Sequence, residues 1–308
     1  MPSVTSCGTG LIRGSSRDAA AGSCAYSDYR LRLTITMTVD PLHAKKSLGQ
    51  NFLQDDHYLA KIAAAAKLEP DDQVVEIGPG LGHLTRKIAQ QVKRLVVIEI
   101  DDRLIAPLRA EFSSIPSVEV VHADALQYDY AALPGTWKVV ANLPYYISTA
   151  IIQRLIACRG RFTSLVLMLQ KEVAYRITAA PGGKEYGFLS VLVQYHTVPR
   201  VAFLVPPGAF TPRPKIDSAV VILQIRACPA VSVGDEQLFL QVIKAAFSQR
   251  RKTLRNALAR LGIAQDAMTV VQEVTGIDLG RRAETLSLAE FASLSEAMGG
   301  QLTQRPLN

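Results

Sequence analysis

From about residue 41 to residue 228, short apolar runs of strand length alternate with stretches of helical character, and this alternation constrains the fold more than any other feature of the sequence. Such a succession is typical of a mostly parallel sheet with helices packed on it. The runs that we expect to form strands are Gln73 to Ile77, Arg94 to Ile98, Val118 to His122, Lys138 to Ala141, Ser164 to Leu169, Val201 to Val205 and Ser218 to Ile225. A Pro-rich link, PPGAFTPRPK, joins the last two runs and suits an antiparallel pair at one edge of the sheet. The sequence therefore predicts an α/β domain over residues 41–228.

The two flanks of this region have a different character. Residues 1–40 are rich in Ser, Gly, Ala and Thr and keep no periodicity, so we expect a disordered tail, or a misassigned leader if translation starts at Met37. After Cys228 the strand signals stop. Helical patterns then follow over Glu236 to Gly262, Gln265 to Thr275 and Ser287 to Met298. Residues 229–308 are therefore predicted to form a smaller, all-helical domain.

The composition describes an ordered globular protein, because 48% of the 308 residues are hydrophobic and 20% are charged. A formal net charge of +7 suits a polyanionic partner such as nucleic acid. No apolar run approaches the roughly 18 residues of a membrane span, so no membrane partner is expected. The four cysteines are Cys7, Cys24, Cys158 and Cys228. They show neither a CxxC pair nor metal-ligand spacing, which predicts no disulfide framework, no metal site and a cytoplasmic protein.

A glycine-rich turn directly follows the first predicted strand, in the segment VVEIGPGLGHL. Gly78, Gly80 and Gly82 let the backbone turn sharply and approach a ligand closely at the carboxyl end of the sheet. The dinucleotide fingerprint G-x-G-x-x-G requires glycine at the position that His83 occupies here. The spacing is G-x-G-x-G instead, so a nucleotide-like ligand other than a dinucleotide is favoured.

Two acidic residues end the next two predicted strands. Glu99 follows roughly 20 residues after Gly78, which is the usual distance for an acid that binds a ribose hydroxyl in such folds. Asp124 ends the third strand in the segment HAD and is available for an adenine amino group. The order of glycine turn, first acid and second acid predicts a nucleoside site.

The segment NLPYYIS, residues 142–148, places an amide, a rigid proline and two aromatic rings where a predicted strand ends. With this segment, the chain from about Lys45 to Arg260 resembles the ribosomal RNA adenine N6-dimethyltransferase family. The motifs that carry the resemblance are SLGQNFL (47–53), EIGPGLGHLT (76–85), VIEID (97–101), NLPYYIS (142–148), LQKEV (169–173), PPGAFTPRPKIDSAVV (206–221) and FSQRRKTLRN (247–256). The resemblance implies a Rossmann-like class I methyltransferase sheet and S-adenosylmethionine as the cofactor. Together with the glycine turn, it assigns the cofactor site to Asn51, Leu53, Gly78, Gly80, Glu99, Asp124 and Asn142.

The resemblance also gives NLPYYIS a chemical role. Adenine N6 is a poor nucleophile, and two acceptors, the side-chain oxygen of Asn142 and the carbonyl of Leu143, can draw its amino hydrogens out of the ring plane, with Pro144 fixing the turn. Tyr145 is expected to stack on the flipped-out base. Two further aromatic residues are assigned separately: Phe210 is expected to supply the second face of this sandwich, and Tyr146 is expected to be a core aromatic.

The basic segment FSQRRKTLRNALAR is expected to lie on a helix whose apolar stripe is buried and whose other face contacts phosphates. The residues assigned to RNA are Arg250, Arg251, Lys252 and Arg255, and Lys45 and Lys46 could extend the track. The substrate implied by the resemblance is a pair of adjacent adenosines in the 3′-terminal hairpin loop of small-subunit ribosomal RNA, within a (pre-)30S-type particle. We expect the protein to act as a monomer.

Three alternatives remain at this point. The related large-subunit adenine methyltransferase of macrolide resistance would use the same chemistry on another RNA, although PKIDSAVV and FSQRRKTLRN favour the small-subunit enzyme. An assembly or transcription factor could keep the fold without catalysis, which the intact Gly78, Glu99, Asp124 and NLPY argue against. An NAD-dependent dehydrogenase is disfavoured by the glycine spacing.

Overall fold

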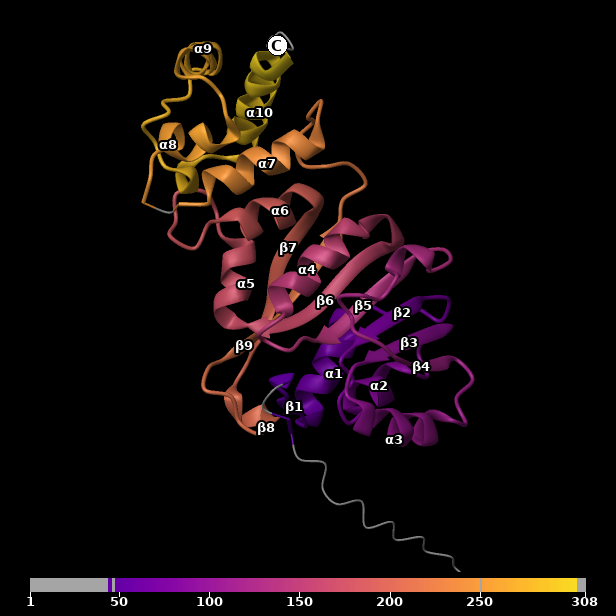
Figure 1. Ribbon diagram of the computed structural model, residues 1–308. Coiled ribbons are helices and arrows are strands. Elements are labelled where there is room, and N and C mark those ends of the chain that lie inside the picture. Colours follow the sequence, from indigo (N-terminus) through magenta and orange to yellow (C-terminus); the bar gives the residue numbers. More distant parts are fainter. Residues whose placement is uncertain (1–43, 46–47, 250, 304–308) are drawn as a thin grey trace, which may run out of the picture. The chain divides into compact units, whose positions relative to one another are not determined.

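The computed structural model describes residues 44–45, 48–249 and 251–303, so the predicted tail at residues 1–40 lies outside the described residues. Its centre is a seven-stranded sheet with the strand order β4-β3-β2-β5-β6-β9-β7 (Figure 1). The strands are β1 (Phe52–Leu53), β2 (Gln73–Ile77), β3 (Arg94–Glu99), β4 (Val118–His122), β5 (Trp137–Asn142), β6 (Phe162–Gln170), β7 (Thr197–Val205), β8 (Phe210–Thr211) and β9 (Ser218–Ile225). β1 and β8 form a separate two-stranded sheet.

The sheet combines parallel strands with an antiparallel pair at one edge, as predicted. β4, β3, β2, β5 and β6 pair in parallel, while β9 runs antiparallel to both β6 and β7 and so forms the edge pair expected from the sequence. All seven predicted strands are confirmed, and four of them are longer than predicted, β7 by four residues at its start. The Rossmann-like arrangement with an antiparallel edge is therefore confirmed.

Helices cover the parallel part of the sheet on both faces, which explains why its strands are apolar runs and do not alternate with polar residues. The helices are α1 (Asp56–Ala65), α2 (His83–Ile88), α3 (Asp102–Phe112), α4 (Ser148–Ala157), α5 (Lys171–Thr178), α6 (Phe188–His196), α7 (Glu236–Ala246), α8 (Leu254–Leu258), α9 (Gln265–Thr275) and α10 (Leu288–Thr303). Val75 and Val139 point to a core layer shared with α4, α5 and α6. Val74 and Val140, each one position away along its strand, point to the opposite layer with α1 and α2.

After β9 the described chain is helical, as predicted, and α7 to α10 pack around a core that includes Phe239, Leu254 and Phe291. The single helix expected over Glu236 to Gly262 is wrong, because α7 ends at Ala246 and α8 begins at Leu254. In the described part of the chain, no helix has both the length and the apolar character needed to cross a membrane.

Tertiary hydrogen bonds account for this interruption of the expected helix. Leu254 and Arg255 donate their backbone N–H groups to the carbonyl oxygens of Arg281 and Leu279, at 2.9 and 3.0 Å. The N–H groups that a continuous helix would use internally are therefore committed to another segment, and Thr253 adopts an extended conformation before α8.

Candidate active site

A pocket opens at the carboxyl ends of the parallel strands, where β3 and β4 lie to one side of β2 and β5 lies to the other. This is the switch point of the strand order, the usual ligand position in open α/β sheets. Gly78, Glu99, Asp124 and Asn142 all line the pocket, at or just beyond the ends of β2, β3, β4 and β5. The structure therefore brings together four residues that the sequence analysis assigned to one cofactor.

The glycine turn after β2 forms one wall of this pocket. Gly80 has φ +57°, and a Cβ atom there would lie 2.7 Å from Cδ1 of Phe52. Any larger residue would be strained in conformation and would collide with a buried ring. The Gly80 N–H donates to Oε2 of Glu99 at 3.3 Å, so the turn and the first acidic residue hold each other in place.

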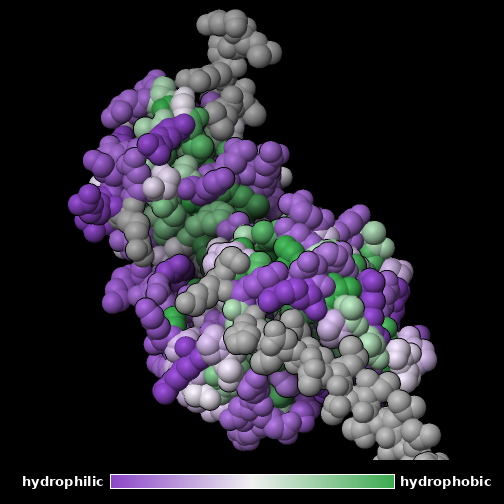
Figure 2. All heavy atoms as spheres, turned by 60° about the horizontal axis from the view of Figure 1, so that its bottom comes forward, coloured by the Kyte–Doolittle hydropathy of each residue, from purple (hydrophilic) through white to green (hydrophobic). Residues whose placement is uncertain are grey.

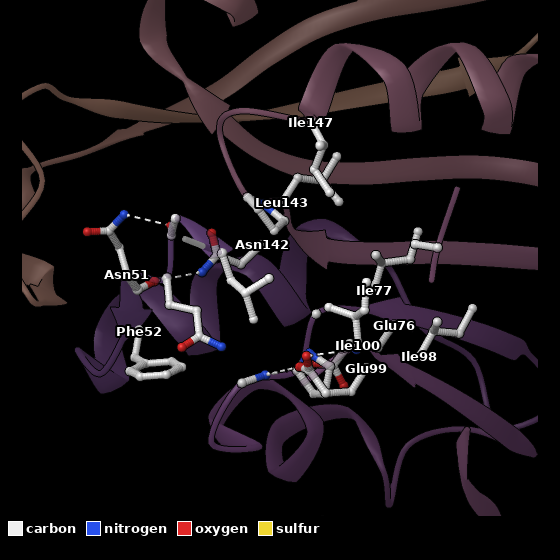
Figure 3. Close-up of a pocket in the computed structure, with 18 of the residues that line it drawn as sticks. Asn51, Phe52, Glu76, Ile77, Ile98, Glu99, Ile100, Asn142, Leu143 and Ile147 are labelled. Carbon is white, nitrogen blue, oxygen red and sulfur yellow. Dashed lines mark hydrogen bonds between the residues drawn. The ribbon is translucent and has the colours of Figure 1, made fainter. Parts of the chain in front are cut away.

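Glu99 is buried, and three backbone N–H groups fix its carboxylate. Besides Gly80, Ile100 donates to Oε1 at 2.9 Å (Figure 3), and Asp101 donates to the same oxygen at 2.8 Å. Burial raises its pKa, and these three hydrogen bonds oppose that rise. A carboxylate oriented in this way still has lone pairs for the hydroxyl groups of a ribose.

Asp124 is fixed by a single contact. Its Oδ1 accepts a hydrogen bond from the N–H of Leu126 at 2.8 Å, and no described residue donates to Oδ2. One oxygen is thus used to orient the side chain, and the other is available to an amino group in the pocket.

Glu76, the penultimate residue of β2, is a pocket residue that was not singled out from the sequence. Its side chain is buried, and Oε2 has no hydrogen-bond partner within the described part of the chain. Burial raises its pKa to about 8, and the neighbouring Glu99 adds to the effect. The signal was present in the sequence, because a glutamate interrupts the apolar run VVEI. Its unpartnered oxygen, together with Glu99 and Asp124, suits a ligand that carries a cationic sulfonium and several N–H and O–H donors, which fits S-adenosylmethionine.

The segment that precedes α1 closes another side of the pocket. The carbonyl oxygen of Asn51 accepts a hydrogen bond from Nδ2 of Asn142 at 3.3 Å, and Asn51 donates its own Nδ2 to the carbonyl of Gly49 at 3.1 Å (Figure 3). Leu53 is buried and pairs with Phe210 between β1 and β8. Asn51 and Leu53 both line the pocket to which we assign the cofactor.

Asp101 anchors this segment to the end of β3. Its fully buried carboxylate accepts hydrogen bonds from Nε2 of Gln50 at 2.9 Å and from Nζ of Lys45 at 3.1 Å, and it forms an ion pair with Arg103 at 2.6 Å. Hydrogen bonding from Arg103 above all holds the Asp101 pKa well below its usual range. Lys45 is therefore paired with Asp101 while 37% of its side chain stays exposed, and its part in an RNA track stays a prediction. Lys46 lies outside the described residues.

The NLPYYIS segment begins at the last residue of β5. Since Nδ2 of Asn142 donates to Asn51, its Oδ1 is the acceptor left for a substrate, and no described residue donates to it. Leu143 is buried and donates its N–H to the carbonyl of Met168 at 3.2 Å, which fixes the backbone at the start of the turn. The hydroxyl of Tyr145 lies 2.6 Å from Oγ of Ser218, so its ring is held at the pocket.

The structure contradicts the core position expected for Tyr146, and it leaves the stacking role of Phe210 a prediction. Phe210 is only 4% exposed, because the pairing of β8 with β1 turns its ring into the core beside Leu53 and Leu59, and it does not line the pocket. Tyr146 was expected in the core but is 59% exposed at the pocket. The core positions beside it are filled by Leu143 and Ile151, which leaves the Tyr146 ring outside.

The residues assigned to RNA lie between α7 and α8 or at the start of α8. Arg251 and Lys252 are exposed in the turn that replaces the expected continuous helix. Arg255 is half-buried and donates from Nη2 to Oε1 of Gln272 at 3.1 Å, so it is partly engaged in packing. Arg250 falls outside the residues that the structure describes.

Comparison with known sequences identifies close relatives over most of the chain. The model of the family described as ribosomal RNA adenine dimethylase matches residues 42–299. Ribosomal RNA small subunit methyltransferase A of Geobacter metallireducens is 48% identical over 269 residues, which cover 85% of this chain and 98% of that protein. The protein of the same name from Geobacter sulfurreducens is 49% identical over 276 residues, covering 86% and 100%.

Solved structures show the same architecture. A dimethyladenosine transferase from Plasmodium falciparum matches with a TM-score of 0.67 and 27% identity, covering 79% of this chain and 95% of that one. The 23S rRNA methyltransferase ErmE matches with a TM-score of 0.63 and 27% identity, covering 81% and 100%. The chain therefore belongs to the ribosomal RNA adenine dimethylase family.

Proposed function

We propose that the protein transfers methyl groups from S-adenosylmethionine to N6 of two adjacent adenosines in the 3′-terminal hairpin loop of small-subunit ribosomal RNA, giving N6,N6-dimethyladenosine. Its family identifies it as an S-adenosylmethionine-dependent rRNA adenine methyltransferase. The observation that carries the proposal is the position of Asn142. Its side chain donates a hydrogen bond to the carbonyl of Asn51, which belongs to the pocket-lining residues 48–53, here called the cofactor-side segment. Its Oδ1 remains available beside Tyr145.

The chain's own residues can prepare the amino group for attack. The N6 lone pair of adenine is delocalised into the ring, so the nitrogen becomes nucleophilic only when its hydrogens leave the ring plane. Asn142 Oδ1 and the Leu143 carbonyl are the acceptors assigned to those hydrogens, and bonds that strengthen as the nitrogen becomes pyramidal favour the transition state. When bound, S-adenosylmethionine supplies an electrophilic methyl group.

Tyr145 is suited to hold the target base. Its hydroxyl is fixed on Ser218 while its ring lines the pocket, so the ring loses little freedom when a base stacks on it. Base–aromatic stacking contributes about 1–3 kcal/mol, which offsets much of the cost of taking a base out of its stack.

The choice of the small subunit rests on the relatives. Proteins named for the small subunit are 48% and 49% identical to this chain, whereas the large-subunit enzyme ErmE is 27% identical. We assign the helical region after residue 228, with Arg251 and Lys252 exposed, to contacts with ribosomal RNA phosphates. A monomer acting in the cytoplasm on a (pre-)30S-type particle completes the proposal, and residues 1–40 are assigned no part in it.

The test is methyl transfer to isolated ribosomal subunits that lack the modification. Small subunits incubated with the protein and S-adenosylmethionine should acquire a block to primer extension at two adjacent adenosines near the 3′ end. Large subunits from the same cells are the matched control and should remain unmodified. Modification of large subunits alone would assign the chain to the other RNA, and modification of neither would contradict the proposal.

A further inference from the structure

Tyr146 is an exposed aromatic ring on the rim of the pocket, and packing in the core does not require an aromatic residue there. Two other aromatic residues line the same pocket: Phe52 is 9% exposed and lies against the glycine turn, and Tyr145 is half-buried with its hydroxyl bonded to Ser218. Tyr146 is 59% exposed, and its side chain makes no hydrogen bond or ring contact with the described residues. The face drawn in Figure 2 is mostly hydrophilic, with hydrophobic patches in between, and among the large apolar residues of the described surface only Val274 is more exposed than Tyr146.

The backbone opposite this ring is shaped to leave room for it. Gly49 has φ +57°, and a Cβ atom there would lie 3.0 Å from Cδ1 of Tyr146. A side chain at position 49 would therefore push the ring away. Gly49 also belongs to the segment whose Asn51 carbonyl binds Asn142, so the Tyr146 ring lies where the cofactor-side segment meets the acceptor for the substrate.

We propose that Tyr146 stacks on an unpaired RNA base that flanks the target base; this inference rests on the proposed function. Loop nucleotides of RNA expose their bases, and an aromatic side chain with a solvated face is the usual surface on which such a base stacks. Moving the target base to Tyr145 leaves its neighbour without a stacking partner on one side. A second ring next to Tyr145 in the chain replaces that partner, and the buried Phe210 does not.

The flanking base also explains why a tyrosine is exposed here at all. In the free protein the ring lies against Gly49 and neither packs in the core nor forms a hydrogen bond with the described residues, so its outer face stays solvated. In the complex it covers an apolar base face and is itself covered. Tyr146 is therefore a substrate-binding residue that sets affinity for unpaired RNA, distinct from the acceptors that act on N6.

The experiment compares three variants in methyl transfer to small subunits that lack the modification. Tyr146→Ala and Tyr146→Leu should each raise the KM for subunits about tenfold, because one base loses its stacking partner. Tyr146→Phe keeps the ring and should keep the low KM. Tyr175→Ala is the matched control, since Tyr175 is also an exposed tyrosine, at 43%, and does not line the pocket.

Binding of S-adenosylmethionine, measured by calorimetry, separates this role from simple packing. The dissociation constant should be the same for wild type and all Tyr146 variants. An unchanged KM in Tyr146→Ala and Tyr146→Leu would overturn the inference, and so would a loss confined to S-adenosylmethionine binding, which would make the ring a cover for Gly49. If the wild-type protein does not modify small subunits, the proposed function itself fails. If the wild type is active and the Tyr146→Ala variant is equally active, only the inference about Tyr146 fails.

Discussion

Asn142 combines two contacts that a simpler side chain could not make at once. Its amide nitrogen binds the Asn51 carbonyl at 3.3 Å, and this bond fixes which way the amide faces. The oxygen then points away from that contact and is the acceptor that we propose for the N6 hydrogens. An aspartate could not donate to Asn51, and a serine would be too short to reach both partners. The residue type therefore follows from the geometry at the end of β5.

The first prediction concerns Asn142 itself. Asn142→Ala should lower kcat for methyl transfer about 100-fold, because an acceptor that acts mainly in the transition state is lost, while S-adenosylmethionine affinity falls much less. Single-turnover transfer to small subunits and calorimetry with the cofactor measure the two effects. A variant with wild-type kcat would show that Asn142 has no role at the amino group.

The predicted site residues that line the pocket at the sheet edge share one property. Gly78, Glu99, Asp124 and Asn142 lie at the ends of parallel strands, and consecutive parallel strands must bring their carboxyl ends to one edge. Phe210 could not be placed in this way, because the pairing of a two-residue strand with β1 decides its direction.

Tyr146 was misplaced for a related reason. Its exposure depends on which neighbouring residues fill the core around the turn, and those residues cannot be identified from the local sequence. The break between α7 and α8 is a third case, since hydrogen bonds to residues far along the chain override a continuous helical pattern. Strands and strand ends were thus predictable, and contacts between distant segments were not.

At the scale of elements, the site depends on how the segment before α1 is held against the loop after β3. Asp101 makes that connection: its side chain is fully buried, it receives Gln50 and Lys45 from the segment, and its own N–H binds Glu99. Two pocket-lining elements that are distant in the sequence are therefore joined through one carboxylate. Its strongly lowered pKa means that the charge is present at all physiological pH values.

The second prediction is that Asp101→Asn weakens S-adenosylmethionine binding about tenfold, since the segment loses charged hydrogen bonds that order it. Asp102→Asn is the control, because the Asp102 side chain is 74% exposed and contacts Lys45 only at 3.5 Å. Calorimetry on both variants measures the difference. Equal affinities in the two variants would mean that Asp101 does not order the cofactor site.

At the scale of the whole molecule, the pocket contains a carboxyl group whose charged form is unfavourable inside the sheet. Glu76 is buried in β2 with its pKa raised to about 8. Below the pKa of an ordinary glutamate, both folded and unfolded chains keep the proton. Between that value and about 8, the folded protein keeps a proton that the unfolded chain has lost, so the free energy of unfolding decreases as pH rises. The contribution is fully present at low pH and is lost once pH passes the folded-state pKa.

The third prediction follows from this decrease in the free energy of unfolding as pH rises. In the absence of cofactor, the Tm of wild type should fall more between about pH 5 and about pH 8.5 than the Tm of Glu76→Gln, which has no proton to lose. Glu69→Gln, at an exposed carboxylate, should behave as wild type. Parallel Tm profiles for wild type and Glu76→Gln, recorded by differential scanning calorimetry, would contradict the buried position of this carboxyl.

The central claim is that this chain dimethylates adjacent adenosines of small-subunit ribosomal RNA through the pocket at the ends of β2 to β5. Nucleoside mass spectrometry of small subunits treated with wild type or Asn142→Ala tests it most directly. Wild type should convert two adenosines per subunit to N6,N6-dimethyladenosine, and Asn142→Ala should leave them almost unmodified in the same time. If wild type formed no N6,N6-dimethyladenosine, the assigned activity would be wrong, and if both proteins formed it equally fast, the role of Asn142 in the pocket would be wrong.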